Sequence, residues 1–201
     1  TSNLTLRRKL GARIAKRFEG KDLAVETDPE SGSISISLDD MFLFHNDSAE
    51  LRDTVKGRLQ TIIPLYAKEL LGEPAIRSRI TSINVIGHAS PRFGKAAVDP
   101  LTKDAVAYNH NLDLSTNRAR EIVKYVFSYE FGDFKYKYIL RKKVIASGRS
   151  FSAPIALNSV DNLGDKEIGR CEKFDCKKSR RVEISFSLDE NVTQNKPLFA
   201  H

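Results

Sequence analysis

Arg118 is the residue whose type and position in this sequence most clearly suggest chemistry. It lies in the stretch Asn111-Leu112-Asp113-Leu114-Ser115-Thr116-Asn117-Arg118-Ala119, in which Ser115 is expected to cap a helix. Arg118 would then occupy the first helical turn, where free backbone N–H groups and the helix dipole already favour an anion. A guanidinium there predicts a carboxylate-binding site. The alternative is a surface arginine paired with Asp113 or Glu121.

A second segment, Ile83-Asn84-Val85-Ile86-Gly87-His88-Ala89-Ser90, has the apolar run of a central strand. His88 at its end is most simply a hydrogen-bonded strand residue, because no nucleophile with an orienting acid is spaced around it. Ser90 and Ser115 have no Gly-x-Ser-x-Gly context, and the sequence has no glycine-rich phosphate loop. We therefore expect neither an enzyme nor a cofactor.

The composition is that of a soluble globular protein with an anionic partner. The 201 residues are 40% hydrophobic and 29% charged, with a net charge of +7. Nucleic acid, a membrane surface and acidic wall peptides all fit that charge. Basic and aromatic residues alternate over 134–138, but this pattern indicates a half-exposed strand, and no nucleic-acid motif accompanies it. We expect no nucleic-acid partner.

The termini and cysteines bear on the cellular compartment. The sequence starts at Thr1 and its one methionine is Met41, so we expect a processed or excised segment; no apolar run approaches a bilayer span. Cys171 and Cys176 lie in a loop-like segment that can close a short disulfide, which hints at an oxidising compartment. A metal half-site would need further ligands that the four histidines do not supply at any recognisable spacing. Two free thiols are the third possibility.

Periodicity gives the expected elements of the first half. Residues 1–20 read as a basic amphipathic helix that can serve as an arm or linker, and residues 23–38 as a hairpin with its turn at 28–32. Asp47 and Glu50 form a capping-box pattern before a helix with Leu51 and Val55 on its buried stripe. Pro64 is expected to kink or break that helix.

The second half supplies further strands around the Arg118 helix. Residues 91–110 read as a long loop, 143–147 as a strand, and 182–188 as the clearest alternating strand of the chain. Strand, helix, strand, helix and two strands in this order favour an α+β sandwich with the helices on one face of a mixed sheet. We divide the chain into an N-terminal helix and hairpin (1–33), the main domain (34–188) and a tail (189–201).

Four blocks of the main domain resemble one family, the C-terminal domain of the outer-membrane protein OmpA, shared with peptidoglycan-associated lipoproteins and the stator subunit MotB. Residues 42–51 are similar to its opening strand and helix start, and 85–88 to its second strand. Leu114-Ser115-Thr116-Asn117-Arg118-Ala119 resembles its Leu-Ser-x-x-Arg-Ala signature. Ser179-Arg180-Arg181-Val182-Glu183-Ile184 resembles its closing Asn-Arg-Arg-Val-Glu-Ile strand. The short form at residues 111–115 is nearer to the MotB-like branch.

The resemblance implies a periplasmic domain that binds the diaminopimelate of peptidoglycan stem peptides. It also implies a homodimer that is held to the inner membrane by a transmembrane segment absent from this chain, beside an ion-driven motor subunit. The implied ligand contacts are Arg118, Asn111, Ser90, Leu114, Ser115 and Arg180, with no metal. A Cys171–Cys176 disulfide is implied too, because family members often carry cysteines before the closing strand.

One departure from the family pattern concerns the ligand's ammonium group. The family has Gly-His-Thr-Asp, whose Asp binds this ammonium, whereas this chain has Gly87-His88-Ala89-Ser90. Serine supplies no charge, and loss of one partner of a desolvated pair typically costs a few kcal/mol. Asp99 or Asp104 is a possible replacement, and Ser179 in place of the family Asn weakens the case for Arg180.

Two functions follow from these residues. The first is a wall-anchoring domain of a MotB-like stator or envelope protein, with Arg118 holding a peptide carboxylate. The second keeps the fold but has lost wall binding through Ser90, and serves as a dimerisation or docking module of a secretion or defence motor complex.

Overall fold

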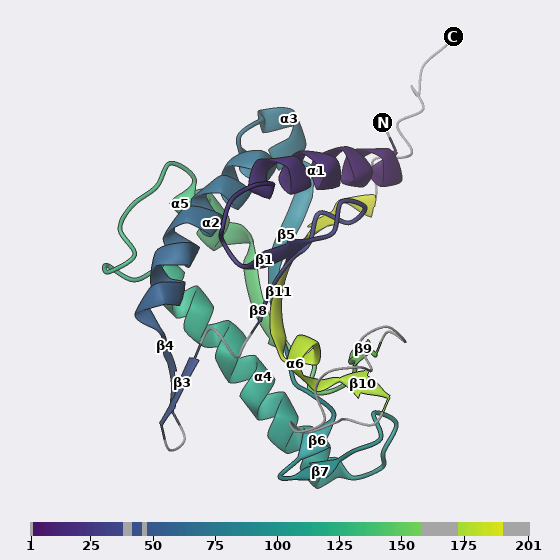
Figure 1. The fold of residues 1–201 in the computed structure, drawn as a ribbon. Coiled ribbons are helices and arrows are strands. Elements are labelled where there is room, and N and C mark those ends of the chain that lie inside the picture. Colours follow the sequence, from purple (N-terminus) through teal and green to yellow (C-terminus); the bar gives the residue numbers. More distant parts are fainter. Residues whose placement is uncertain (1, 38–41, 46–47, 158–172, 191–201) are drawn as a thin grey trace.

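The computed structural model describes residues 2–37, 42–45, 48–157 and 173–190 (Figure 1). In chain order the described elements are α1 (Asn3–Phe18), β1 (Val25–Thr27), β2 (Ile34–Ser37), β3 (Phe42–His45), β4 (Ser48–Leu51), α2 (Asp53–Leu71), α3 (Pro74–Arg77), β5 (Ile80–His88), β6 (Arg92–Phe93), β7 (Ala96–Ala97), α4 (Ala105–Val126), α5 (Lys137–Lys143), β8 (Val144–Gly148), β9 (Ile155–Ala156), β10 (Phe174–Asp175), α6 (Cys176–Ser179) and β11 (Arg181–Leu188).

The central sheet has five strands in the order β1-β2-β11-β5-β8, in which only the β5–β8 pair is parallel. Alternate residues of β11 are buried, namely Val182, Ile184, Phe186 and Leu188, while the residues between them are partly exposed. One face of the sheet is therefore apolar and the other polar, as a sheet covered on one side requires. The predicted α+β architecture with a mixed sheet is confirmed.

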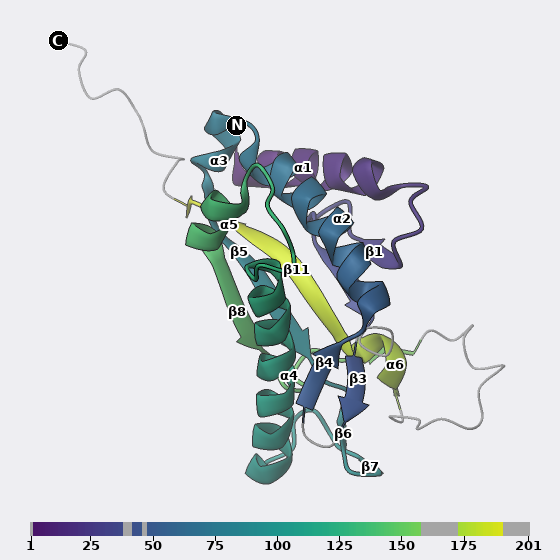
Figure 2. The same cartoon turned by 90° about the vertical axis from the view of Figure 1, so that its left-hand side faces the viewer.

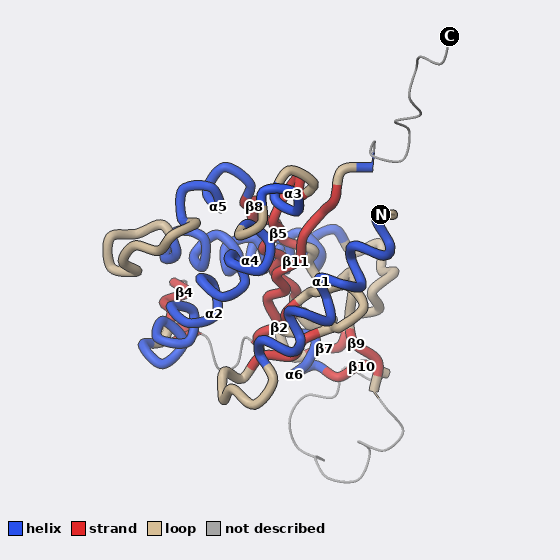
Figure 3. Tube along the Cα trace, turned by 90° about the horizontal axis from the view of Figure 1, so that it is seen from above, coloured by secondary structure: helices blue, strands red, loops and turns tan. Residues whose placement is uncertain are grey.

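The helices form a layer on the apolar face of the sheet. Figure 2 looks onto this layer, with α2 and α4 in front of β11 and β5, and Figure 3 shows the same layering from above. Side chains from α1, α2, α4 and α5 share one core with the buried residues of β2, β5 and β11. Tyr66 of α2 donates a hydrogen bond to the Gly32 backbone oxygen (2.9 Å) inside this core.

Helix α1 is fastened to α2 by ion pairs as well as by apolar contacts. Leu10 and Ile14 of α1 are fully buried. Arg13 and Arg17 each lie within 2.9 Å of a carboxylate oxygen of Glu69, whose side chain is only 5% exposed. The basic N-terminal helix therefore packs into the core of the described structure instead of standing away from it as an arm. The domain boundaries at residues 33 and 188 stay predictions.

One prediction for residues 47–64 is wrong, and of the two outcomes expected at Pro64 the helix break does not occur. Ser48 to Leu51 form strand β4, which pairs with β3, and α2 begins only at Asp53, so no capping box starts a helix at this point; Asp47 itself lies outside the described residues. Pro64 lies within α2, which continues to Leu71. The helix survives the loss of one N–H because its buried face, which includes Ile62 and Ile63, packs into the core.

The alternating basic and aromatic residues over 134–138 do not form the expected strand. They form an irregular segment that leads into α5, which starts at Lys137. Phe134 packs edge-on against the ring of Phe131, and Lys137 is buried and donates to the Ser128 backbone oxygen. Packing of these side chains in three dimensions thus overrides the period-two pattern.

We expect Glu69→Ala to lower the free energy of unfolding by about 2–3 kcal/mol, because it leaves two guanidinium groups without their buried carboxylate. Glu30→Ala is the matched control, since it breaks an Arg8 pair whose side chains are 60% and 72% exposed and should cost about 0.5 kcal/mol or less. Urea unfolding of the two variants gives both values. Equal losses would contradict the assignment of Glu69 as the ion-pair centre that holds α1.

Candidate functional site

Helix α4 begins at Ala105, eleven residues before the predicted helix start at Thr116. Asp104 is its N-cap, accepting hydrogen bonds from the backbone N–H groups of Val106 (2.9 Å) and Ala107 (3.1 Å). The predicted cap, Ser115, lies inside the helix, and Arg118 is in its second half. The first-turn argument for an anion site is therefore wrong, and only the burial and surroundings of Arg118 can support such a site.

The buried face of α4 is mostly polar before Ala119 and mostly apolar from Ala119 onward. Its second half buries Ala119, Ile122 and Val126, the predicted apolar stripe. The part of α4 before Ala119 instead buries Ala107, Asn111, Ser115 and Arg118 at helical spacing. Arg118 is only 7% exposed, so it is no surface arginine. A mostly polar stripe at this spacing was the sequence signal for the missing half of the helix.

Helix α4 crosses the sheet at unusually short range because two glycines leave room for it. A Cβ atom on Gly87 of β5 would lie 1.9 Å from the backbone oxygen of Ser115, and one on Gly148 of β8 would lie 2.3 Å from Thr116 Oγ1. Ser115 Oγ accepts a hydrogen bond from the Ser150 backbone N–H (3.0 Å). Ser115 therefore positions α4 against the sheet and does not cap it.

Beside this crossing lies an open pocket of about 350 Å³. It brings together five of the six residues that the sequence assigned to the ligand; Ser115, fully buried, is not among those that line it. Neutral and charged polar groups thus meet at the carboxyl end of β5. The lining residues are Ala89, Ser90, Arg92, Gly94, His110, Asn111, Leu114, Arg118 and Arg180.

Arg92 and His110 are lining residues that the sequence did not reveal. Arg92 lies on β6, only two residues after Ser90, but in a segment read as loop. His110 packs edge-on against Phe93, with ring centroids 5.4 Å apart. Neither belongs to a recognisable motif, so three-dimensional proximity alone identifies them.

Asn111 holds the wall of the pocket together. Its side-chain amide nitrogen donates to the backbone oxygens of Arg92 (2.9 Å) and Ala107 (3.0 Å), which ties β6 to α4. Asn111 is 5% exposed, so these bonds are shielded from water. It therefore fixes the position of Arg92 beside Arg118.

Neither expected replacement acid lines the pocket. Asp104 caps α4, and the Asp99 carboxylate accepts a hydrogen bond from the Leu101 backbone N–H. Both carboxylates thus hold the loop before α4 in shape. Ser90 remains the residue at the position of the family acid.

Arg180 reaches the pocket from the segment between α6 and β11. Ser179 beside it is fully buried and accepts a hydrogen bond from the Ile155 backbone N–H (2.9 Å), which holds this segment against the loop that follows β8. The serine in place of the family Asn therefore does not keep Arg180 away from the pocket. Cys176 is buried, whereas Cys171 lies outside the described residues, so their pairing stays a prediction.

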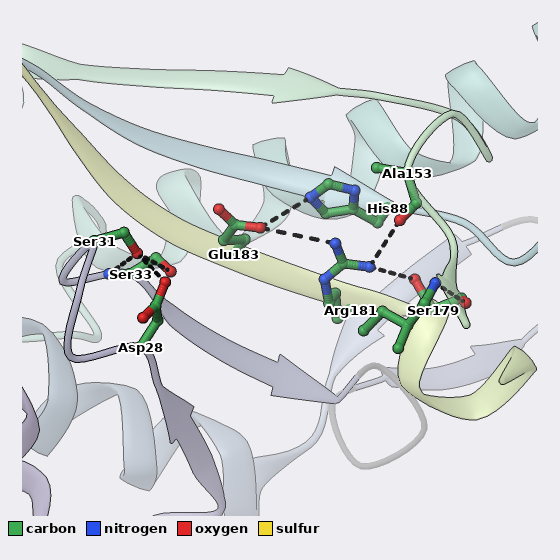
Figure 4. Close-up of polar contacts among 9 residues, drawn as sticks. Asp28, Ser31, Ser33, His88, Ala153, Ser179, Arg181 and Glu183 are labelled. Atoms are coloured by element: carbon green, nitrogen blue, oxygen red, sulfur yellow. Dashed lines mark hydrogen bonds and ion pairs between the residues drawn. The ribbon is translucent and has the colours of Figure 1, made fainter. Parts of the chain in front are cut away.

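A second polar cluster lies on the open face of the sheet next to the pocket (Figure 4). His88 Nε2 is 3.5 Å from a carboxylate oxygen of Glu183, which in turn is 3.8 Å from Arg181 Nη2. Burial lowers the pKa of His88. The polar contact with His88, together with the charge of Arg181, lowers the pKa of Glu183. His88 is thus buried at the end of β5, as expected, but neither of its ring nitrogens forms a hydrogen bond with the described residues, so the expected hydrogen-bonded state is not found there.

The described helices include none that is long and apolar enough to cross a bilayer. No family model and no curated protein matches the chain. Solved structures do resemble it. They include the cell wall anchor of the T6SS from Pseudomonas aeruginosa, with 23% identity, a TM-score of 0.49, and coverage of 91% of this chain and 99% of that one.

Two further structures are similar. One is a MotB-like protein from Desulfovibrio vulgaris, with 16% identity, a TM-score of 0.49, and coverage of 92% of this chain and 96% of that one. The other is the periplasmic domain of Helicobacter pylori MotB, with 20% identity, a TM-score of 0.42, and coverage of 88% and 84%. These three structures are described as a cell wall anchor, a MotB-like protein and a MotB periplasmic domain.

We expect Gly87→Ala to destabilise the fold by about 3 kcal/mol, because the new methyl group would push α4 away from β5. Gly57→Ala is the control: it lies on the exposed side of α2 with open space around it and should stabilise the protein by about 0.5–1 kcal/mol. Thermal unfolding of both variants tests this. An unchanged melting temperature for Gly87→Ala would show that the crossing is not tight.

We expect the free energy of unfolding to decrease as the pH is lowered below about 6.5. The reason is that His88 takes up a proton more readily in the unfolded chain than in the folded protein, where burial lowers its pKa. His88→Gln should flatten this decline. A further loss should follow below about 4.5, where the unfolded chain protonates Glu183 before the folded protein does. Unfolding free energies measured from pH 4 to 8 separate the two steps; an unaltered slope in His88→Gln would contradict the assignment.

Proposed function

We propose that this chain is a peptidoglycan-binding domain that anchors a membrane protein of the MotB-like class to the cell wall in the periplasm. The observation that carries the proposal is the burial of Arg118 at 7% exposure in a pocket with Arg92, Arg180 and Ser90. A buried guanidinium that lines an open pocket is suited to a planar anion, because its N–H groups can form paired hydrogen bonds with a carboxylate.

The position of the pocket supports an anchoring role. Figure 1 places α1 and the N-terminus at one end of the molecule, and β6, which contributes Arg92 to the pocket, near the other. A membrane tether that enters through α1 would leave the pocket facing away from the membrane. In this proposal the domain is a homodimer and works beside a motor subunit of the inner membrane.

The role is binding and not catalysis. Three arginine side chains line the pocket, and Leu114 adds an apolar wall on which an aliphatic peptide side chain can rest. Leu114 is 37% exposed, so a ligand can reach it. This combination fits the end of a stem peptide, whose carboxylates sit on a short aliphatic chain.

We expect purified peptidoglycan sacculi to co-sediment the protein, and Arg118→Ala to reduce the bound fraction at least about tenfold, since it removes a charge-assisted bidentate contact. Arg120→Ala is the matched control, because its side chain is 60% exposed and pairs with Glu121; it should bind like the parent protein.

Circular dichroism spectra of both variants check that they are folded. Failure of the parent protein to sediment at any salt concentration would overturn wall binding and favour the docking module as its function. Sedimentation unaffected by Arg118→Ala would remove the pocket from the proposal.

A further inference from the structure

Three helices gather at the end of the molecule opposite the pocket. Lys143 at the end of α5 donates to the backbone oxygen of Ile80, the first residue of β5. Asn3 of α1 donates to the Asp189 backbone oxygen, and the Asp189 N–H donates to the Arg79 backbone oxygen between α3 and β5. Figures 1 and 2 both show α1, α3 and α5 at this end. The pocket lies beyond the other end of β5, a nine-residue strand that spans about 30 Å.

These three helices contain basic residues and no acidic ones. Helix α1 has six basic residues, α3 has one and α5 has four. Neighbouring carboxylates compensate part of this charge, because Glu69 pairs with Arg13 and Arg17, and Glu30 pairs with Arg8. We call the surface formed by α1, α3 and α5 the basic end of the molecule.

Two lysines stand on the outer face of α1. Lys9 and Lys16 form an exposed stripe with Thr5 and Ala12 at helical spacing, opposite the buried face that contains Leu10. Neither lysine forms an ion pair with the residues that the structure describes. Because Thr5 and Ala12 are short, an extended surface can approach both ammonium groups at once.

Helix α5 adds exposed cations beside an exposed aromatic ring. Arg141 and Lys142 are exposed, and the Arg141 guanidinium lies 5.1 Å from the centroid of the Tyr138 ring. Tyr138 is itself 58% exposed, and Leu4 of α1 is 59% exposed. Amphipathic rings and long cationic side chains of this kind are favoured at the interface between a bilayer and water. The combination favours a lipid surface as the anionic partner of this end.

We propose that the basic end binds the surface of a membrane that contains anionic phospholipids, with Lys9 and Lys16 as the main contacts. Lysines on the outside of a helix suit such a surface, because lipid phosphates are mobile and each flexible ammonium group can find one. The inference does not depend on wall binding. Since the pocket lies at the opposite end, one molecule can contact a membrane and a second anionic partner at the same time.

The test is co-sedimentation of the full chain with vesicles of phosphatidylglycerol, compared with vesicles of phosphatidylcholine. We expect binding to the anionic vesicles that weakens as salt is raised, because salt screens contacts between exposed charges. Combining Lys9→Gln with Lys16→Gln should lower the partition coefficient about 30-fold, since each lysine near an anionic membrane surface contributes about fivefold.

Combining Lys103→Gln with Lys177→Gln gives the matched control. It removes the same charge from two exposed lysines that lie outside the basic end, one just before α4 and one in α6. This variant should bind the vesicles nearly as the parent protein does. Glutamine replaces an exposed lysine at little cost to a helix, and thermal unfolding checks that both double variants are folded.

Absence of binding to phosphatidylglycerol at low salt would overturn the inference, and so would equal binding to phosphatidylcholine. Equal losses in the two double variants would also overturn it, because net charge and not the basic end would then determine binding. If the parent protein bound a double-stranded DNA oligonucleotide more tightly than the vesicles, and the Lys9 and Lys16 changes abolished that binding, the partner of this end would be nucleic acid and not lipid.

Discussion

The close crossing of α4 over β5 and β8 is the constraint on which the site depends. It exists because Gly87 and Gly148 carry no Cβ at the points where the helix backbone and Thr116 approach them. Ser115 then bonds to the Ser150 backbone, which adopts a positive φ of 52° and in turn accepts from the Ala89 N–H (2.8 Å). Through these contacts the helix position determines where the end of β5 lies, and with it the distance between Ser90 and the arginines of the pocket.

The sequence predicted the elements whose buried faces are apolar. Strand β11 and the second half of α4 show clear periodicity, because one face of each lies against the core. The first half of α4 was missed because its buried face includes Asn111 and Ser115, and an apolar-stripe rule cannot recognise a helix that buries polar groups. Two of the missed elements, the start of α4 and β6, contribute His110, Asn111 and Arg92 to the lining of the pocket.

Most residues assigned to the candidate site lie together in the structure, although one of the two arguments for Arg118 was wrong. The motif resemblance placed Asn111, Leu114 and Arg118 at one pocket, although the helix-start reasoning for Arg118 was wrong. Arg92 was missed because its role comes from the β6 turn and from Asn111, neither of which has a sequence pattern. The β3–β4 hairpin was missed because Asp47 to Glu50 fit a capping box and a turn equally well, and only pairing of the two strands decides between them.

The energetics of the polar stripe bear on the choice between wall binding and a docking module. Burying a guanidinium and an amide at the helix–sheet interface is unfavourable unless their donors are used, and apolar residues of similar volume would often be as stable there or more so. Arg118 is 7% exposed and lies on the wall of an open pocket, where in the proposed function it contacts the ligand. The interactions that hold the fold, such as Tyr66 to Gly32 and Arg13 to Glu69, lie elsewhere in the core and do not need this arginine. The proposed recognition of an anion gives a reason for placing a buried arginine on the wall of this pocket.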